Sequence, residues 1–231
     1  MTKARTWFFL PRVPEPEVME GCEETEAYTS AASQAHLNRL DNTFVDHVLT
    51  LGVTSGLALD VGTGPGQIPM KLALRLPQLQ IIGLDLSEAM LKQAQHDAQA
   101  SGVADRVTFQ IGDAKKLSFP AGHFDLVICN SLLHHVPHPL VTLNELARVT
   151  RPDGAILLRD LRRPRALAFP FHVLWFGRHY RGLMKKLFGD SVLSAYTEQD
   201  LQKLLSQSKI SGGRVFRSGG SHIGIERSST R

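Results

Sequence analysis

The chain is poor in cysteine and has no long apolar run, and each absence excludes a class of protein. Its 231 residues include only Cys22 and Cys129, too few for the disulfide framework of a small secreted domain. The apolar stretch at residues 7–10 stops at Pro11, too short for a signal peptide or for a membrane span of about 20 residues. No internal repeat or low-complexity tract is visible. We therefore expect a cytoplasmic protein with an ordinary hydrophobic core that contains Cys129.

Acidic residues are nearly absent from one segment, residues 159–186. It contains eight Lys or Arg residues against one Asp, whereas the net charge of the whole chain is only +4. A local excess of positive charge attracts polyanions and anionic membrane surfaces. Any RNA-binding or membrane-binding interpretation therefore depends on this segment.

Short apolar runs alternate with helical patterns through the middle of the chain. The runs are too continuous for half-solvated strands, which indicates strands covered on both faces; they are residues 57–61, 80–84, 106–110, 124–129 and 154–158. Helical patterns lie between them at residues 66–76, 87–101 and 138–150. This alternation predicts an α/β fold of βαβ units with a mainly parallel sheet.

We expect one domain over residues 1–231, with two segments outside the alternation. Its parts are an N-terminal lid and helix (1–50), a core (51–160), a basic and aromatic insertion (161–196), and a C-terminal helix with two strands (197–231). The first part becomes helical from about residue 24 to residue 49. The two last strands, 213–217 and 221–227, are expected to pair antiparallel at the sheet edge.

A glycine-rich loop follows the first expected strand. The stretch LDVGTGPGQ, residues 59–67, places Gly62, Gly64 and Gly66 where the backbone must turn tightly and approach a ligand. Alone, such a loop is equally typical of a plain strand–helix turn. Two acids strengthen the ligand interpretation: Asp85 ends the second strand, where a carboxylate binds ribose hydroxyls, and Asp113 follows the third.

The spacing of the glycines separates two adenosine cofactors. Dinucleotide-binding loops read G-x-G-x-x-G, whereas this loop reads G-x-G-x-G with Asp60 two residues before the first glycine. A carboxylate there repels a pyrophosphate but suits a cationic amino-acid group. This pattern favours S-adenosylmethionine over NAD.

Four motifs, in order, resemble those of class I S-adenosylmethionine-dependent methyltransferases that act on small molecules. They are ALDVGTGPGQ, IIGLDLSEAML, VTFQIGDAKKLSFPAGHFDLVICNSLLHHVPHP and LNELARVTRPDGAILLRD, within residues 56–160. The resemblance implies a Rossmann-like doubly wound sheet of strand order 3-2-1-4-5-7-6, with strand 7 antiparallel and a helical insertion after strand 5. It also implies S-adenosyl-L-homocysteine as the product.

The same resemblance assigns a cofactor site. It puts Asp60 and the glycines near the methionine group, Asp85 on the ribose, Asp113 near the adenine, and Asn130 beside the cofactor at backbone level. The expected cofactor residues are Asp60, Gly62, Thr63, Gly64, Gly66, Asp85, Leu86, Met90, Asp113, Ala114 and Asn130.

Three histidines follow the fourth strand, in NSLLHHVPHP. Metal binding is not expected, because His134, His135 and His138 lack the i, i+4 pairing with a nearby acid and methyl transfer needs no metal. We expect His138 to be a solvated loop residue. His134 and His135 are candidate general bases, with Asp160 at the end of the fifth strand as orienting partner. The alternative is that a histidine only packs the loop or touches the cofactor.

Three functions remain open. The first is O- or C-methylation of a small lipophilic metabolite, with substrate or lid residues Met19, Tyr28, Trp175 and Tyr180. The second is RNA methylation along the basic segment, disfavoured because NSLL is not the Asn/Asp-Pro-Pro-aromatic motif of base-amine methylation. The third is peripheral membrane association, in which the basic-apolar segment collects a quinone or lipid. A monomer and a homodimer both remain possible.

Overall fold

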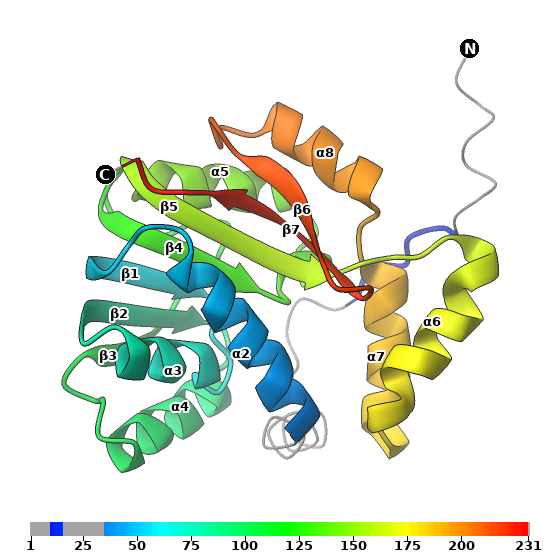
Figure 1. Ribbon diagram of the computed structural model, residues 1–231, viewed down its shortest axis with the longest axis horizontal. Helices are drawn as coiled ribbons and strands as arrows, with labels where there is room; N and C mark the ends of the chain where they lie inside the picture. The colour runs from blue at the N-terminus through cyan, green and yellow to red at the C-terminus, as the bar shows by residue number, and fades with distance from the viewer. Residues whose placement is uncertain (1–9, 16–34, 231) are drawn as a thin grey trace.

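The computed structural model describes residues 10–15 and 35–230, which build one seven-stranded sheet between helices (Figure 1). The strand order is β3-β2-β1-β4-β5-β7-β6, which confirms the expected 3-2-1-4-5-7-6. The strands are β1 (Ser55–Val61), β2 (Gln78–Asp85), β3 (Val107–Ile111), β4 (Phe124–Asn130), β5 (Thr150–Leu161), β6 (Arg214–Ser218) and β7 (His222–Arg227).

Pairing is parallel from β3 to β5, and β7 runs antiparallel to both of its neighbours, as expected. The largest difference from the expected strand boundaries is in β5, which begins at Thr150 rather than at residue 154. The Pro152-Asp153-Gly154 stretch reads as a turn, but the strand accommodates it through a register shift between the pairs Phe124–Thr150 and Leu126–Ala155.

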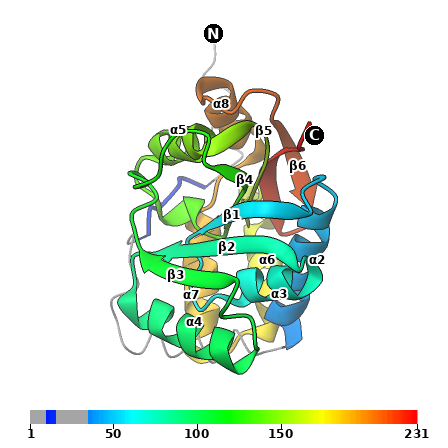
Figure 2. The same cartoon turned by 90° about the vertical axis from the view of Figure 1, so that its left-hand side faces the viewer.

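The sheet is covered on both faces, which explains its continuous apolar strands. One face packs against α2 (Ala35–Leu49), α3 (Gln67–Arg75) and α4 (Glu88–Ala100), and the other against α5 (Pro139–Val149) and α8 (Glu198–Gln207) (Figure 2). Cys129 is 1% exposed inside the second core, as expected. Residues 24–34 of the expected first helix lie outside the described residues.

The insertion after β5 forms two helices, α6 (Phe169–Phe176) and α7 (Gly182–Ser194), beyond the carboxyl ends of the parallel strands (Figure 1). A small apolar cluster anchors them: Phe188 and Val192 of α7 pack with Leu161 at the end of β5. Within the described part of the chain, no helix combines the length and the apolar character needed to cross a bilayer.

Candidate active site

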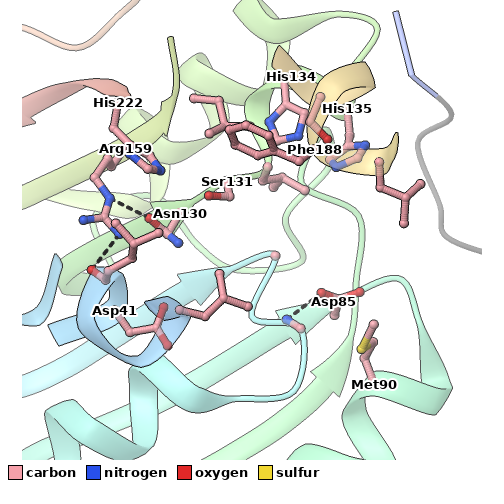
Figure 3. A pocket seen from close by; sticks show the side chains of 18 of the residues that line it. Asp41, Asp85, Met90, Asn130, Ser131, His134, His135, Arg159, Phe188 and His222 are labelled. Atoms are coloured by element: carbon pink, nitrogen blue, oxygen red, sulfur yellow. Dashed lines mark hydrogen bonds between the residues drawn. The ribbon is translucent and has the colours of Figure 1, made fainter. Parts of the chain in front are cut away.

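A cavity of about 230 Å³ lies at the carboxyl ends of β1, β2, β4 and β5, the edge where open α/β sheets bind ligands (Figure 3). We call one part the glycine end, formed by residues 62–64, 84–90 and 112–114. The opposite part is the histidine end, formed by residues 131–136, 176–191 and 221–222. Figure 3 shows Asp85 and Met90 at the glycine end, with His134 and Phe188 across the cavity.

The glycine loop needs glycine for two reasons. Gly62, Gly64 and Gly66 have φ angles of 75°, 53° and 75°, which side chains rarely allow. A Cβ atom on Gly62 would lie 2.9 Å from Leu132 Cδ2, and one on Gly66 would lie 2.7 Å from a ring carbon of Phe109. The loop is therefore pressed against its neighbours while its backbone faces the cavity.

The carboxylate of Asp85 holds this loop in place. Its two oxygens accept hydrogen bonds from the backbone N–H of Gly64 at 2.8 Å and of Ser87 at 2.9 Å. A carboxylate has about four acceptor positions, so two hydroxyl donors from a ligand are still accommodated. Two vicinal hydroxyls, as on a ribose, match this capacity.

Asp113 sits beyond β3 at the same end of the cavity. Its Oδ1 accepts from the Lys115 backbone N–H at 2.8 Å and lies 3.0 Å from Lys115 Nζ. Partial burial would raise the pKa of Asp113, but these hydrogen bonds and the lysine charge outweigh it and lower the pKa. The group is therefore an anionic acceptor at neutral pH.

His134 and Asp160 form a buried acid–imidazole pair at the histidine end. His134 Nδ1 donates to Asp160 Oδ1 at 2.6 Å, and the His134 backbone N–H donates to the other carboxylate oxygen at 2.8 Å. Both residues are 2% exposed. Because Nδ1 is held by Asp160, the remaining ring nitrogen, Nε2, is the atom with which His134 can exchange a proton.

The backbone of His134 is also fixed from the opposite side. Its carbonyl accepts hydrogen bonds from Arg12 Nη2 at 2.9 Å and from the Ser194 hydroxyl at 2.5 Å. Just before it, Ser131 has a φ of 56°, the single positive φ among the described non-glycine residues. This turn, itself at the cavity wall, carries the chain from β4 to the 3-10 turn Leu133–His135.

Burial and charge oppose each other in this pair. Burial lowers the pKa of His134, but the charge and hydrogen bond of Asp160, assisted by Glu15, outweigh it, so the pKa of His134 is raised. Burial likewise raises the pKa of Asp160, and the imidazole charge and hydrogen bonds outweigh that effect and lower it. The two directions agree, so the pair favours imidazolium and carboxylate.

Comparison with known proteins identifies the family of the central part of the chain. A family model described as "Methyltransferase domain" matches residues 59–158, which include the glycine loop, Asp85, Asp113 and His134. Residues 59–158 therefore form a methyltransferase domain of the class I, S-adenosylmethionine-dependent kind. The motif resemblance found in the sequence is thereby confirmed.

Each of the similar proteins below is matched over only part of its own length. A 27-O-demethylrifamycin SV methyltransferase of Amycolatopsis mediterranei is 34% identical over 44% of this chain and 37% of that protein. A demethylmenaquinone methyltransferase of Geobacillus kaustophilus is 33% identical over 61% of this chain and 58% of its own. The chain thus spans about half the length of the curated relatives it matches.

A solved structure agrees in fold over most of the chain. The plantazolicin methyltransferase BpumL, in complex with a triazolic desmethyl analogue of plantazolicin and S-adenosylhomocysteine, superposes with a TM-score of 0.68. It covers 90% of this chain and 91% of its own, at 16% identity. At that identity the likeness establishes a shared fold.

The glycine end of the methyltransferase domain fits S-adenosylmethionine. The glycine cradle leaves space that a Cβ would fill, and Asp85 retains acceptor capacity for a ribose. Asp60 lies beneath this end rather than in the cavity wall: it is 1% exposed and accepts the Thr63 hydroxyl at 2.7 Å. Through this hydrogen bond Asp60 supports the loop from inside the protein. Burial raises the pKa of Asp60 to about 7.

Most of the expected site residues of the methyltransferase domain meet in one cavity. Those in its wall are Gly62, Gly64, Asp85, Leu86, Met90, Asp113, Ala114, Asn130, His134, His135 and Tyr180. Asp60, Thr63, Gly66 and Asp160 stand behind the wall and support it. Met19 and Tyr28 lie outside the described residues.

Trp175 is not brought to the cavity. It is 63% exposed on α6, whereas Phe176, the next residue, lines the cavity. Tyr180 does reach the wall and is 7% exposed; burial raises its pKa to about 12, so its phenol stays protonated. His138 is exposed, as expected of a solvated loop residue.

Arg159 is a site residue that the sequence reasoning counted only as part of the basic segment. It is 2% exposed, and its Nε donates to Asn130 Oδ1 at 2.9 Å (Figure 3). Burial lowers its pKa to about 10, so it remains a cation. A charged residue in the otherwise apolar GAILLRD run was the available signal.

His222 was also missed, because nothing in a short strand such as β7 distinguishes one inward position from another. It begins β7, is 5% exposed and lines the cavity. Burial and the nearby Arg159 charge lower its pKa to about 3, so it stays neutral. Its Nδ1 lies 2.8 Å from the Ser221 hydroxyl, so this neutral histidine is a hydrogen-bonding position rather than a charged one.

Glu15 was missed because 119 residues separate it from His134. Its Oε2 lies 3.6 Å from His134 Nε2 and 3.4 Å from His135 Nδ1. Burial raises the pKa of Glu15 against the opposing effect of the His134 charge. The three residues offer ligand atoms within 4.8 Å of one another, so this is where the described residues could hold a cation.

Proposed function

We propose that this chain transfers a methyl group from S-adenosylmethionine to an oxygen or carbon of a small, largely apolar acceptor, with His134 as general base. The observation that carries the proposal is that one cavity contains both the glycine end and, facing it, the buried His134–Asp160 pair. When bound, S-adenosylmethionine supplies an electrophilic methyl group on a sulfonium. The chain's own task is then to position the acceptor and to remove its proton.

The residues of the glycine end are suited to hold the cofactor. The backbone turn at Gly62 and Gly64 lets the cofactor approach closely, and Asp85 offers acceptor positions for the ribose hydroxyls. Asp113, an anionic acceptor paired with Lys115, lies near the expected adenine. Gly62, Gly64, Asp85 and Asp113 are residues that the family resemblance assigns to the cofactor, and all four line the cavity.

The base chemistry follows from the fixed imidazole. Neutral His134 would accept the acceptor's proton at Nε2, while the acceptor oxygen or carbon keeps the electron pair that attacks the methyl carbon. Asp160 then stabilises the imidazolium through the 2.6 Å hydrogen bond at Nδ1. Because the backbone of His134 is fixed by Asp160, Arg12 and Ser194, the imidazole needs little reorganisation.

The wall of the histidine end favours an apolar acceptor. Apolar side chains from α2, β5, α6 and α7 line it: Leu37, Leu40, Leu161, Phe176, Met184, Leu187 and Phe188. Two relatives are named as methyltransferases of 27-O-demethylrifamycin SV and of demethylmenaquinone, both small molecules. Cytoplasmic location and oligomeric state stay predictions.

RNA methylation is less well supported. Two of the basic residues that would track phosphates are committed to the fold. Arg159 is 2% exposed, and Arg163 is 8% exposed with its guanidinium bonded to the Ala195 carbonyl and to Asp200. A buried cation that already has acceptors gives little to a phosphate backbone.

Replacing the base tests the proposal. Methyl-labelled cofactor and a metabolite extract would identify a labelled product, and His134→Ala should slow its formation about 10²–10⁴-fold. Affinity for S-adenosylhomocysteine, measured by calorimetry, should change little. His138→Ala, an exposed histidine of the same loop, is the matched control.

Two results would contradict the base assignment. Unchanged turnover in His134→Ala would remove His134 from the chemistry. Turnover that is lost on chelation and restored by a divalent cation would instead make Glu15, His134 and His135 a metal centre.

A further inference from the structure

The exposed apolar side chains of the described residues are unevenly distributed. Nine large hydrophobic residues are exposed, and the four most exposed all lie within nine positions: Leu167, Phe171, Leu174 and Trp175, at 90%, 73%, 64% and 63%. Exposed apolar residues scattered singly need no explanation, whereas a contiguous group indicates an interaction surface.

Phe171, Leu174 and Trp175 share one side of α6, and Leu167 lies in the 3-10 turn Ala166–Ala168 just before it. Their spacing, i, i+4, i+7 and i+8, is that of a single helical face. The opposite side of α6 is committed to the protein: His172 is 6% exposed, and Phe176 lines the cavity. We call the four residues the α6 outer face. One short helix thus separates the cavity from an apolar surface at the edge of the molecule (Figure 1).

Exposed cations lie in the same insertion as the α6 outer face, and one of them contacts it directly. Between residues 161 and 189 the chain has seven Lys or Arg residues and no acid. Five of the seven are exposed: Arg165, Arg178, Arg181, Lys185 and Lys186. The Arg178 guanidinium stacks over the Trp175 ring at 4.3 Å and donates to the Trp175 carbonyl at 2.7 Å. A cation beside an exposed tryptophan suits the boundary between an apolar phase and water.

We propose that the α6 outer face docks on an anionic phospholipid membrane and that the acceptor enters the cavity from the lipid phase. Leu167, Phe171, Leu174 and Trp175 insert among the acyl chains near the headgroups, and the exposed cations of the insertion contact lipid phosphates. The source of the acceptor rests on the proposed function, whereas the docking itself does not.

Charge favours a membrane over a second copy of the chain. A two-fold contact through the α6 outer face would bring the exposed cations of one copy close to those of the other. Chemistry favours a membrane over RNA, because Leu167 and Leu174 offer no stacking surface for bases while lipid chains accept them. An anionic bilayer satisfies both the α6 outer face and the exposed cations.

Vesicle binding by the full chain tests the docking. The chain has two tryptophans, so Trp7→Phe leaves Trp175 as the sole emitter. This protein should float with vesicles of mixed phosphatidylcholine and phosphatidylglycerol, and its emission should shift to the blue. Vesicles of phosphatidylcholine alone should bind it about tenfold or more weakly.

Two paired variants separate the apolar from the electrostatic contribution. Phe171→Ser/Leu174→Ser should weaken vesicle binding about tenfold or more, and Lys185→Glu/Lys186→Glu should remove much of its salt sensitivity. Leu74→Ser is the matched control, because Leu74 is a helical leucine of similar exposure, 61%, on α3. It should bind vesicles like the parent.

Other outcomes overturn the proposal. They are absence of flotation, equal flotation of Phe171→Ser/Leu174→Ser, a dimer in sedimentation that this variant loses, and RNA binding that needs Lys185 and Lys186 alone. Flotation is scored without acceptor, so a parent protein that floats but transfers no methyl group, or a His134→Ala protein that floats and keeps full turnover, would reject the proposed function and leave the docking intact. Methyl transfer by a protein that never floats would reject the docking and leave the proposed function intact.

Discussion

The two ends of the cavity are built in different ways. The glycine end consists of strand ends and backbone turns within residues 62–114, where Asp85 bonds to Gly64 only 21 residues away. The histidine end joins distant segments: Arg12 bonds to His134 across 122 residues, and Arg163 bonds to Ala195 across 32. A part built from local backbone leaves a short motif in the sequence, whereas a part built from distant side chains does not.

Breaking the glycine end should have the largest effect. Gly62→Ala places a Cβ in a left-handed residue and within 2.9 Å of Leu132, so S-adenosylhomocysteine binding should be abolished in calorimetry. Gly102→Ala is the control, since its φ of 68° is similar but nothing lies within 4 Å of the added atom. It should lose about 1 kcal/mol of unfolding free energy and keep cofactor affinity. Retained affinity in Gly62→Ala would show that this end does not depend on backbone conformation.

The histidine end should respond to pH through one pair. The neutral imidazole is the active base, so the rate of methyl transfer should rise as pH increases through the raised pKa of His134. Asp160→Asn removes the charge that raises this pKa. The rising limb should therefore move to lower pH, and the plateau should fall about 10²-fold or more because the ring is no longer oriented.

A pH–rate profile of each protein measures both effects. Glu15→Gln removes a smaller contribution to the pKa of His134, so its limb should move in the same direction by less. If the rising limb of the pH–rate profile lies at the same pH in the parent and in Asp160→Asn, the His134–Asp160 pair does not take part in the reaction.

His222 should produce the smallest effect, a change in stability. Its folded pKa is depressed to about 3, so the unfolded chain binds one more proton than the folded chain between about pH 6.5 and 3. Unfolding free energy should thus fall on acidification by about 1.4 kcal/mol per pH unit from this group. His222→Asn should flatten the slope in urea titrations by that amount.

The same contrast explains what the sequence could predict. Strand order, the glycine loop, Asp85 and the adjacency of His134 and Asp160 follow from motifs and from the rule that parallel strand ends share one edge. The pairing of His134 rather than His135 with Asp160 depends on the turn at Ser131. The positive φ of this turn could not be predicted from the sequence, because the residue is a serine and not a glycine. Glu15, His222 and the outward face of Trp175 depend on packing between distant segments.

One buried cation adds polar links between elements that also pack together in the core. Arg159 of β5 donates to Asn130 of β4, to the Thr43 hydroxyl at 2.9 Å and to the Leu40 carbonyl at 3.1 Å, and it lies over the Phe44 ring of α2. If α2 detached alone, this guanidinium would keep its charge and lose two of its acceptors inside the protein. The first described helix is therefore part of the same cooperative unfolding unit as the centre of the sheet, and cannot act as a separately melting flap.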